Sequence, residues 1–291
     1  MRYSLLKQTY RQILVTPKPF IKWAGGKRQH ISLLNENLPE TFGTYYEPFL
    51  GGGALLFHIL TKKNGQKCSI SDLNSDLVLA YTTIRDRIDE LISSLKIHEK
   101  NYQKDSKSYY YSVRGINPRS QIEKTSRLLF LNRTCFNGLY RVNSKGKFNV
   151  PLGKYTNPNI VNEENLRSVN DILQSSRISI KCRDFEAVLR DAKKGDLVYF
   201  DPPYQPVSET ANFTSYTNKN FTFEDLSRLS ELCMKLDSKG CMVLLSNSDS
   251  KEVLDMFSKK PWKVSRIQAN RSINSNSKKR TGHFELLIKN Y

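Results

Sequence analysis

Residues 195–204 read Gly-Asp-Leu-Val-Tyr-Phe-Asp-Pro-Pro-Tyr, and this stretch decides the expected fold. A turn is followed by four apolar β-formers, which predicts a short buried strand that ends at Asp201. In open α/β sheets, ligands bind at the carboxyl ends of the parallel strands. We therefore expect Asp201, Pro202 and Tyr204 to lie at a functional edge of such a sheet.

The two prolines of this stretch favour a rigid acceptor site, because proline fixes φ and has no N–H donor. Asp201 and the carbonyl of Pro202 could accept two N–H groups of a planar amine, while Tyr204 stacks on its ring. The plainer alternative is a strand stopped by a Pro-Pro turn, with the aspartate as a cap. The tetrapeptide 201–204 resembles the catalytic motif of amino-methyltransferases that modify an exocyclic nitrogen of a nucleobase with S-adenosylmethionine.

The charge of the chain indicates a polyanionic partner. Its 46 Lys and Arg residues against 28 Asp and Glu give a formal net charge of +18. A solvated basic surface is the alternative, but an excess of this size favours a polyanion. The 291 residues are 38% hydrophobic, which suits one large α/β domain with a smaller inserted or appended one and disfavours global disorder.

The cysteines and the apolar runs disfavour other classes of protein. The five cysteines are scattered without a C-x-x-C pair, which argues against a disulfide framework and a zinc site: Cys68, Cys135, Cys182, Cys233 and Cys241. Residues 1–19 contain no signal-peptide core, and no run approaches the ~20 apolar residues of a membrane span. We expect a soluble, cytoplasmic protein that binds neither a metal nor a membrane.

Two glycine-containing segments near the start predict a nucleotide pocket. In 19–28 a Gly-Gly turn feeds a basic helix start, which could hold an anionic group, although a surface lysine is the plainer alternative. In 44–57 a strand, a glycine turn and an apolar helix follow one another. The next strand ends at Asp72, placed to hold ribose hydroxyls. There is no G-x-G-x-x-G or Walker pattern, which disfavours an oxidoreductase or an NTPase.

The middle of the chain predicts helices followed by a basic hairpin. Apolar residues recur at helical spacing over about 74–111 and again over about 120–132. In 132–151, turns at Asn137-Gly138 and Lys145-Gly146 predict a β-hairpin. Its arginines and asparagines suit a groove-reading element, and an exposed basic hairpin without that role is the alternative.

The α/β pattern resumes after about residue 177. A strand at 178–181 leads to Asp184 and Phe185, an acid–aromatic pair suited to an adenine amine and ring. Residues 205–221 predict a mobile loop beside the site. Further helices and strands are expected as follows: helices at 223–236 and 250–258, and strands at 241–246, about 262–269 and 283–289. The basic loop 270–282 between the last two strands could close on phosphates.

Four motifs stand in the order typical of the Dam-type DNA adenine methylases, which the chain resembles from about Pro19 to Tyr291. They are Phe-Ile-Lys-Trp-Ala-Gly-Gly-Lys at 20–27, Glu-Pro-Phe-Leu-Gly-Gly-Gly-Ala at 47–54, Asn-Gly-Leu-Tyr-Arg at 137–141 and Asp-Pro-Pro-Tyr at 201–204. The resemblance implies a Rossmann-like, seven-stranded α/β methyltransferase with an inserted helical and hairpin-bearing recognition domain. We expect the catalytic domain at 1–75 and 162–291 and the recognition domain at 76–161.

The resemblance also implies roles for individual residues. Catalysis is expected from Asp201, Pro202 and Tyr204. The residues expected to bind S-adenosylmethionine are Trp23, Lys27, Phe49, Gly51, Gly53, Asp72, Asp184, Phe185 and Asp201. The residues expected to face double-stranded DNA are Lys22, Arg133, Phe136, Asn137, Leu139, Arg141 and Pro151.

The activity implied is methyl transfer from S-adenosylmethionine to the N6 amine of a flipped-out adenine, with GATC as the expected target. The enzyme could be solitary or could serve a restriction-modification system with a cognate endonuclease. Two alternatives stay open at this point. One is an RNA or protein methyltransferase with the same tetrapeptide, and the other is a catalytically silent DNA-binding relative.

Overall fold

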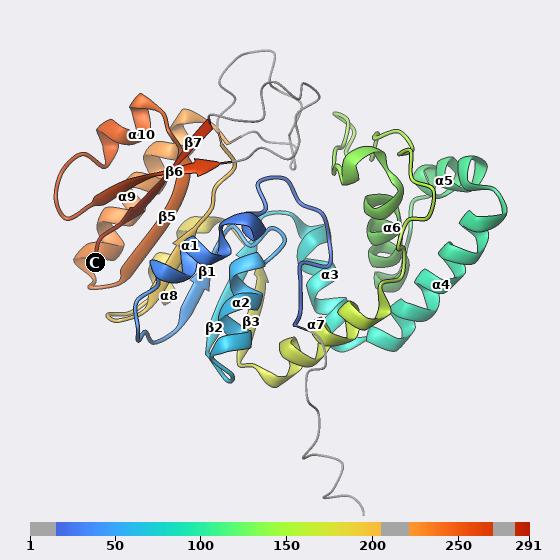
Figure 1. The fold of residues 1–291 in the computed structure, drawn as a ribbon, viewed down its shortest axis with the longest axis horizontal. Coiled ribbons are helices and arrows are strands. Elements are labelled where there is room, and N and C mark those ends of the chain that lie inside the picture. The colour runs from blue at the N-terminus through green and yellow to red at the C-terminus, as the bar shows by residue number, and fades with distance from the viewer. Residues whose placement is uncertain (1–15, 205–220, 270–282) are drawn as a thin grey trace, which may run out of the picture.

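A seven-stranded sheet forms the centre of the molecule in the computed structural model, which describes residues 16–204, 221–269 and 283–291 (Figure 1). The strand order is β3-β2-β1-β4-β5-β7-β6. The strands are β1 (Tyr45–Glu47), β2 (Cys68–Asp72), β3 (Ile178–Cys182), β4 (Leu197–Phe200), β5 (Met242–Ser248), β6 (Lys263–Ala269) and β7 (His283–Lys289). Strands β1 to β5 are parallel to one another, and β7 pairs antiparallel with both β5 and β6. The predicted seven-stranded α/β fold is confirmed.

The order of the strands places a switch point between β1 and β4. The chain runs outward from β1 through β2 to β3, then returns to β4 and runs the other way to β5. At such a reversal the loops that follow the two central strands diverge and leave room for a ligand at their carboxyl ends. Those ends are Glu47 of β1 and Phe200 of β4, which Asp201 follows.

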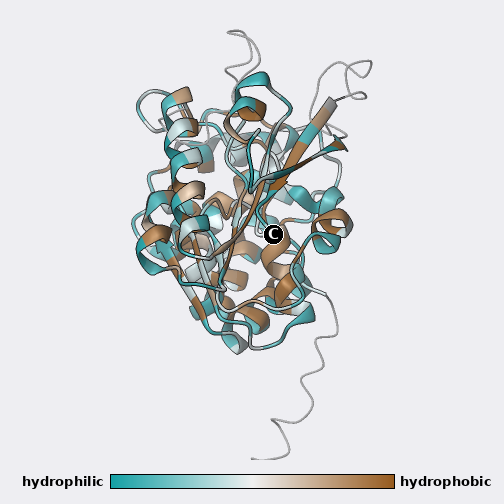
Figure 2. Cartoon of the chain, turned by 90° about the vertical axis from the view of Figure 1, so that its left-hand side faces the viewer, coloured by the Kyte–Doolittle hydropathy of each residue, from teal (hydrophilic) through white to brown (hydrophobic). Residues whose placement is uncertain are grey.

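Helices cover both faces of the sheet, because its strands are apolar on both sides. In β4, Leu197 and Tyr199 belong to one buried cluster, and Val198 and Phe200 belong to the other. This alternation has the two-residue period of a strand, and burial on both faces is the rule for parallel sheets. Hydrophobic residues gather in the interior, while the helices carry hydrophilic residues outward (Figure 2).

The helices follow the expected order. Those of the sheet are η1 (Lys27–His30), α1 (Ile31–Glu36), α2 (Ala54–Lys62), α3 (Ser75–Asp86), α7 (Glu163–Ser175), η3 (Phe185–Ala187), α8 (Val188–Asp191), α9 (Phe223–Ser238) and α10 (Lys251–Met256). Those of the middle segment are α4 (Ile88–Lys104), α5 (Ser106–Gly115), α6 (Gln121–Thr134) and η2 (Phe136–Gly138). Helices α4 to α6 stand apart from the sheet, to the right in Figure 1. Helix α3 contacts both β2 and α6, so it joins the two parts.

Helix boundaries in the middle segment follow local capping signals. The side chain of Asp105 accepts a hydrogen bond from the backbone N–H of Ser108 and thereby starts α5. Ser120 and Glu123 form a reciprocal capping box that starts α6. The Asp105 cap separates α5 from α4, and a break at Arg87, which makes no side-chain cap, separates α4 from α3, so the helical pattern predicted over 74–111 is divided into three helices.

The hairpin predicted over 132–151 forms in its second half alone. Val142 bridges Phe148 antiparallel, the N–H groups of Asn143 and Asn149 donate to the carbonyls of Lys147 and Arg141, and a separate bridge joins Cys135 and Leu152. Asn137 and Gly138 both have positive φ, but they belong to the 3₁₀ turn η2 that reverses the chain after α6. The second predicted turn does close a loop, because the backbone N–H of Gly146 donates to the carbonyl of Asn143 at 2.8 Å.

Three segments discussed from the sequence lie partly or wholly outside the described residues. They are the start of the chain at 1–19, of which 16–19 are described, the polar loop at 205–221, of which residue 221 is described, and the basic loop at 270–282. Among the described helices, none is both long and apolar enough to cross a membrane.

Candidate active site

Acidic side chains from several strands meet at the carboxyl edge of the sheet. Glu47 ends β1, Asp72 ends β2, and Asp201 directly follows β4. Strand β7 runs antiparallel, so its first residues reach the same edge, and its Glu285 lies opposite Ser248 at the end of β5. The sequence did not single out Glu285, because a lone acid in an apolar strand gives no local sign of its neighbours.

Lys27 enters this acidic edge as a buried cation. Its side chain is 5% exposed, and its Nζ lies 2.8 Å from Oδ1 of Asp201 and 3.7 Å from Oε2 of Glu285. It also donates to the carbonyl of Gly25 at 3.0 Å. Burial lowers the pKa of Lys27, but the two carboxylates outweigh it and raise that pKa above its ordinary value, so the ammonium stays charged.

The pKa of the Asp201 carboxyl group is higher than that of an ordinary aspartate. Burial raises its pKa to about 6, although the ammonium of Lys27 opposes this shift, and Glu285 adds to it. Around neutral pH the carboxylate form prevails, and below about pH 6 the protonated form does. A carboxylate can accept hydrogen bonds on both oxygens, whereas the protonated acid loses part of that capacity.

The aromatic ring of Tyr204 lies against this ion pair. The Nζ of Lys27 is 4.8 Å from the ring centroid, a cation–π distance. The hydroxyl of Tyr204 is buried and faces the carboxylate of Glu285. Pro202 is buried between Asp201 and the exposed Pro203. The three predicted catalytic residues therefore lie together with Lys27.

The glycine loop between β1 and α2 is held by Asp72. Its carboxylate accepts the N–H of Gly51 at 3.0 Å and that of Asn74 at 2.9 Å. Gly51 and Gly53 have φ values of 49° and 68°, in the left-handed region that favours glycine. A Cβ on Gly53 would lie 2.5 Å from the hydroxyl of Tyr81, so no larger residue fits there.

Flat aromatic surfaces flank the same edge. Phe49 stacks on Phe185 with ring centroids 5.2 Å apart, and Phe221 meets Phe49 edge to face. Trp23 lies beside the glycine loop, because a Cβ on Gly51 would come within 3.0 Å of its ring. Asp184 forms an ion pair with Arg228 at 3.1 Å. The predicted cofactor residues thus lie around the carboxyl ends of β1, β2, β3 and β4.

The predicted DNA-facing residues gather around the end of the middle segment, with one difference. Phe136 is 47% exposed, and Lys22, Asn137 and Pro151 are exposed as well. Leu139 is partly buried. Arg133 is the difference, because its guanidinium donates to the carbonyl of Phe20 at 2.8 Å and burial lowers its pKa.

Asn132 ties this surface to the segment that carries Lys27. Its side-chain oxygen accepts the N–H of Lys22 at 2.8 Å, and its amide group donates to the carbonyls of Lys22 and Gly138, both at 2.9 Å. Asn132 is 1% exposed, so water cannot replace these bonds. The residue thereby fixes the exposed Lys22 relative to the turn η2.

Replacing Asn132 with alanine should therefore destabilise the protein. Three hydrogen bonds are lost and backbone groups are left unpaired, which should lower the free energy of unfolding by on the order of 3 kcal/mol. Urea denaturation measures this change. Gln121→Ala, an exposed change on the same helix, is the matched control and should have little effect. Equal stability of the two variants would contradict the role given to Asn132.

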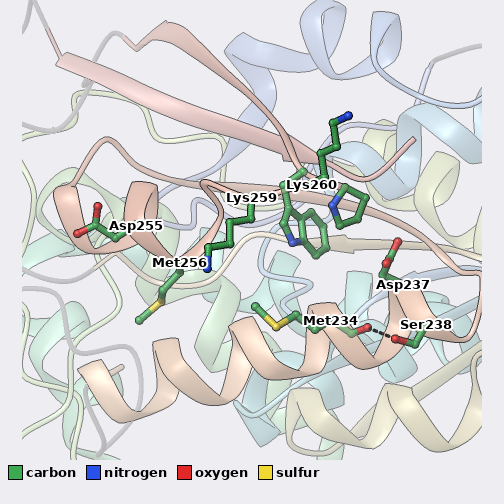
Figure 3. A pocket seen from close by; sticks show the side chains of 9 residues that line it. Met234, Asp237, Ser238, Asp255, Met256, Lys259 and Lys260 are labelled. Atoms are coloured by element: carbon green, nitrogen blue, oxygen red, sulfur yellow. Dashed lines mark hydrogen bonds between the residues drawn. The ribbon is translucent and has the colours of Figure 1, made fainter.

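A separate pocket of about 430 Å³ lies at the other edge of the sheet (Figure 3). The end of α9 and the segment between α10 and β6 line it, including Met234, Met256, Lys259 and Trp262. Helix α9 ends just before β5 begins, so this pocket lies at the amino end of that strand, away from Asp201. It contains none of the predicted site residues.

Comparison with known proteins gives a consistent result. The family described as D12 class N6 adenine-specific DNA methyltransferase matches residues 23–273. The Type II methyltransferase M.MjaIII of Methanocaldococcus jannaschii is 42% identical over 94% of this chain and 99% of its own length. The Type II methyltransferase M1.LlaDCHI of Lactococcus lactis is 41% identical over 94% of this chain and 95% of its own length. The DNA adenine methylase of Haemophilus influenzae is 32% identical over 93% of this chain and 92% of its own length.

Proposed function

We propose that this chain, which belongs to the D12 class of N6 adenine-specific DNA methyltransferases, uses S-adenosylmethionine to methylate adenines flipped out of duplex DNA. It is an adenine-specific DNA methyltransferase by its family, which argues against the RNA and protein alternatives. The observation that carries the proposal is the position of Asp201. This buried carboxylate follows β4 at the switch point, where the two halves of the sheet diverge.

The residues at this edge fit S-adenosylmethionine. The left-handed Gly51 and Gly53 leave backbone that a nucleoside can approach closely, because no Cβ stands in the way. Asp72 at the end of β2 suits ribose hydroxyls, and the stacked Phe49 and Phe185 suit an adenine ring. When bound, S-adenosylmethionine would supply an electrophilic methyl group on its sulfonium.

Asp201 and the carbonyl of Pro202 would activate the target amine by holding it. The lone pair of an adenine amine is delocalised into the ring, which makes the amine a poor nucleophile. Two acceptors for its N–H groups favour a more pyramidal nitrogen and direct the lone pair at the donor methyl. The catalytic effect is then mainly positioning and electrostatics.

The target adenine must leave the helix for this to happen, because its amine is otherwise paired inside the duplex. Flipping costs a few kcal/mol, and stacking in the pocket offsets part of that cost. We assign this stacking to Tyr204, and we assign to the DNA surface Lys22, Phe136, Asn137, Leu139, Arg141 and Pro151. The bond of Arg133 to the carbonyl of Phe20 suits a role in holding the segment that carries Lys22. The recognition domain is 76–161, and the catalytic domain comprises 1–75 and 162–291.

The target sequence proposed is GATC, on the Asn-Gly-Leu-Tyr-Arg motif at 137–141. Two of the similar proteins are named Type II methyltransferases, which supports a role beside a cognate restriction endonuclease. Incubation with labelled S-adenosylmethionine and duplexes that differ only at GATC tests the whole proposal. We expect N6-methyladenine in the GATC duplex, detected by mass spectrometry of its nucleosides. Equal methylation of a duplex lacking GATC would overturn the target, and methylation of RNA instead would overturn the substrate.

Changes at Tyr204 test the stacking assignment. Tyr204→Ala removes the ring and should weaken methyl transfer by about 1–3 kcal/mol in kcat/KM. Tyr204→Phe should be milder, because it retains the ring that stacks on the base. Steady-state kinetics on the GATC duplex compares the two variants. A phenylalanine variant as impaired as the alanine variant would show that the hydroxyl, and not the ring, matters.

A further inference from the structure

Glu285 is a buried acid with an unused hydrogen-bonding capacity. It comes from β7, where it lies opposite Ser248 of β5 and Ile267 of β6. Its side chain is 15% exposed. The Oε2 atom is fully buried and has no hydrogen-bond partner within 16–204, 221–269 and 283–291. A buried carboxylate oxygen whose ion-pair partner lies at 3.7 Å, beyond hydrogen-bonding distance, is costly, so its presence in the site calls for a functional reason.

The ammonium of Lys27 lies between Glu285 and Asp201 and is closer to Asp201. It lies 2.8 Å from Asp201, a hydrogen-bonding distance, but 3.7 Å from Glu285. The carbonyl of Gly25 takes another of its protons at 3.0 Å. A small rotation of the lysine side chain would therefore exchange its partner from Asp201 to Glu285.

This arrangement creates a competition at Asp201. Its Oδ1 is held by a charged donor, so a neutral adenine amine that binds this carboxylate either displaces the ammonium from Oδ1 or binds the second oxygen beside it. In the second case the charge of Lys27 would lie beside the amine that must become the nucleophile. Charge-assisted hydrogen bonds are about twice as strong as neutral ones, so the amine would not displace the ammonium unaided. A buried ammonium also cannot simply be released, because an unpaired buried charge is strongly unfavourable.

We propose that Glu285 is a positioning residue that takes over the Lys27 ammonium when the adenine amine binds Asp201. The exchange keeps the lysine paired and frees the carboxylate for the substrate. This inference rests on the proposed role of Asp201 as the acceptor for the amine. It gives the unpaired Oε2 atom a partner in the substrate complex.

Among the described groups that face Asp201, two carry a charge that the exchange uses. The titratable neighbours, from η1, β1, β4, the turn after β4 and β7, are Lys27, Glu47, Tyr199, Tyr204 and Glu285. Burial raises the pKa of Glu47 well above its usual range and likewise those of both tyrosines, which favours their neutral forms. Lys27 and Glu285 therefore set the charge around Asp201.

The test is the pH profile of single-turnover methyl transfer on the GATC duplex. Because Asp201 must be ionised, the wild-type rate should fall as the pH drops through about 6. Glu285→Gln removes a charge that raises this pKa, so the acidic limb should move to lower pH. The plateau rate should fall about tenfold or more, because Lys27 stays on Asp201. Glu231→Gln, an exposed acid on α9, should change neither.

A second variant separates positioning from a structural role. Lys27→Met removes the ammonium, so adding Glu285→Gln to it should cost far less rate than the same change costs in the wild type. Equal losses in both backgrounds would overturn the inference, as would an unmoved limb in Glu285→Gln. If Glu285→Gln does not fold, Glu285→Asp serves in its place. It retains the charge, so it should slow methyl transfer without moving the acidic limb of the pH profile. A wild-type rate in Glu285→Asp would overturn the inference. Full activity of Asp201→Ala would instead refute the proposed function itself.

Discussion

Replacing Asp201 with alanine should abolish methyl transfer, with a loss of about 10³-fold or more in the single-turnover rate. The change removes an acceptor at the reacting amine, and losing one such preorganised group costs about 10²–10³-fold in well-studied sites. The ammonium of Lys27 also loses its closest partner at 2.8 Å and can turn only to Glu285. Its charge would then lie beside the amine that must become the nucleophile.

The variant must be shown to fold, because Lys27 is buried and a buried charge needs a partner. Circular dichroism and binding of S-adenosylmethionine measured by calorimetry provide this control. Asp201→Asn keeps the shape and one carbonyl acceptor but loses the charge, so it should retain more activity than Asp201→Ala. Turnover of Asp201→Ala comparable to the wild type would refute the mechanism.

Replacing Arg141 with alanine should change which sequences are methylated. A guanidinium can donate to both acceptors of guanine in the major groove, and this contact is worth about 1–3 kcal/mol of discrimination. In the structure Nε of Arg141 donates to Oδ1 of Asn149 at 2.8 Å, which orients the guanidinium plane. We therefore expect relaxed specificity at one G·C pair. Arg141→Lys should also impair discrimination, because an ammonium cannot make the two-point contact.

Methylation rates on GATC and on duplexes with its guanine replaced measure this effect. Lys147 is the matched control, because it is exposed on the turn that follows Arg141 and can contact only the backbone of DNA in our proposal. Lys147→Ala should weaken all substrates alike. If Arg141→Ala also slows every substrate by the same factor, then Arg141 holds the DNA backbone and does not read the base.

The asymmetric partners of Lys27 show how the site combines features from distant parts of the chain. Lys27 follows a Gly-Gly turn, Asp201 follows β4, and Glu285 belongs to the last strand. The resemblance assigned Lys27 to the cofactor alone. The structure adds an ion pair with Asp201, so any change at Lys27 should alter both cofactor binding and the acceptor for the amine.

The sequence by itself determined the elements and their order, because these depend on neighbouring residues. The apolar run before Asp201 is buried on both faces as β4, and the strand 283–289 was predicted with the bounds that the structure shows. Ser120 and Glu123 start α6 through a capping box whose spacing is local. The glycines of the loop after β1 were recognised because positive φ is a requirement of the backbone itself.

Only the tertiary structure decided which side chains meet. Asn137 and Gly138 suit a hairpin turn locally, yet packing against Lys22 and the clamp by Asn132 make them a 3₁₀ turn after α6. Glu285 reaches Asp201 only because β7 inserts antiparallel between β5 and β6. Such contacts arise from the folding of apolar faces onto one sheet. The spacing of residues in the sequence does not indicate these contacts. The charge environment of Asp201 therefore could not be predicted from its own motif.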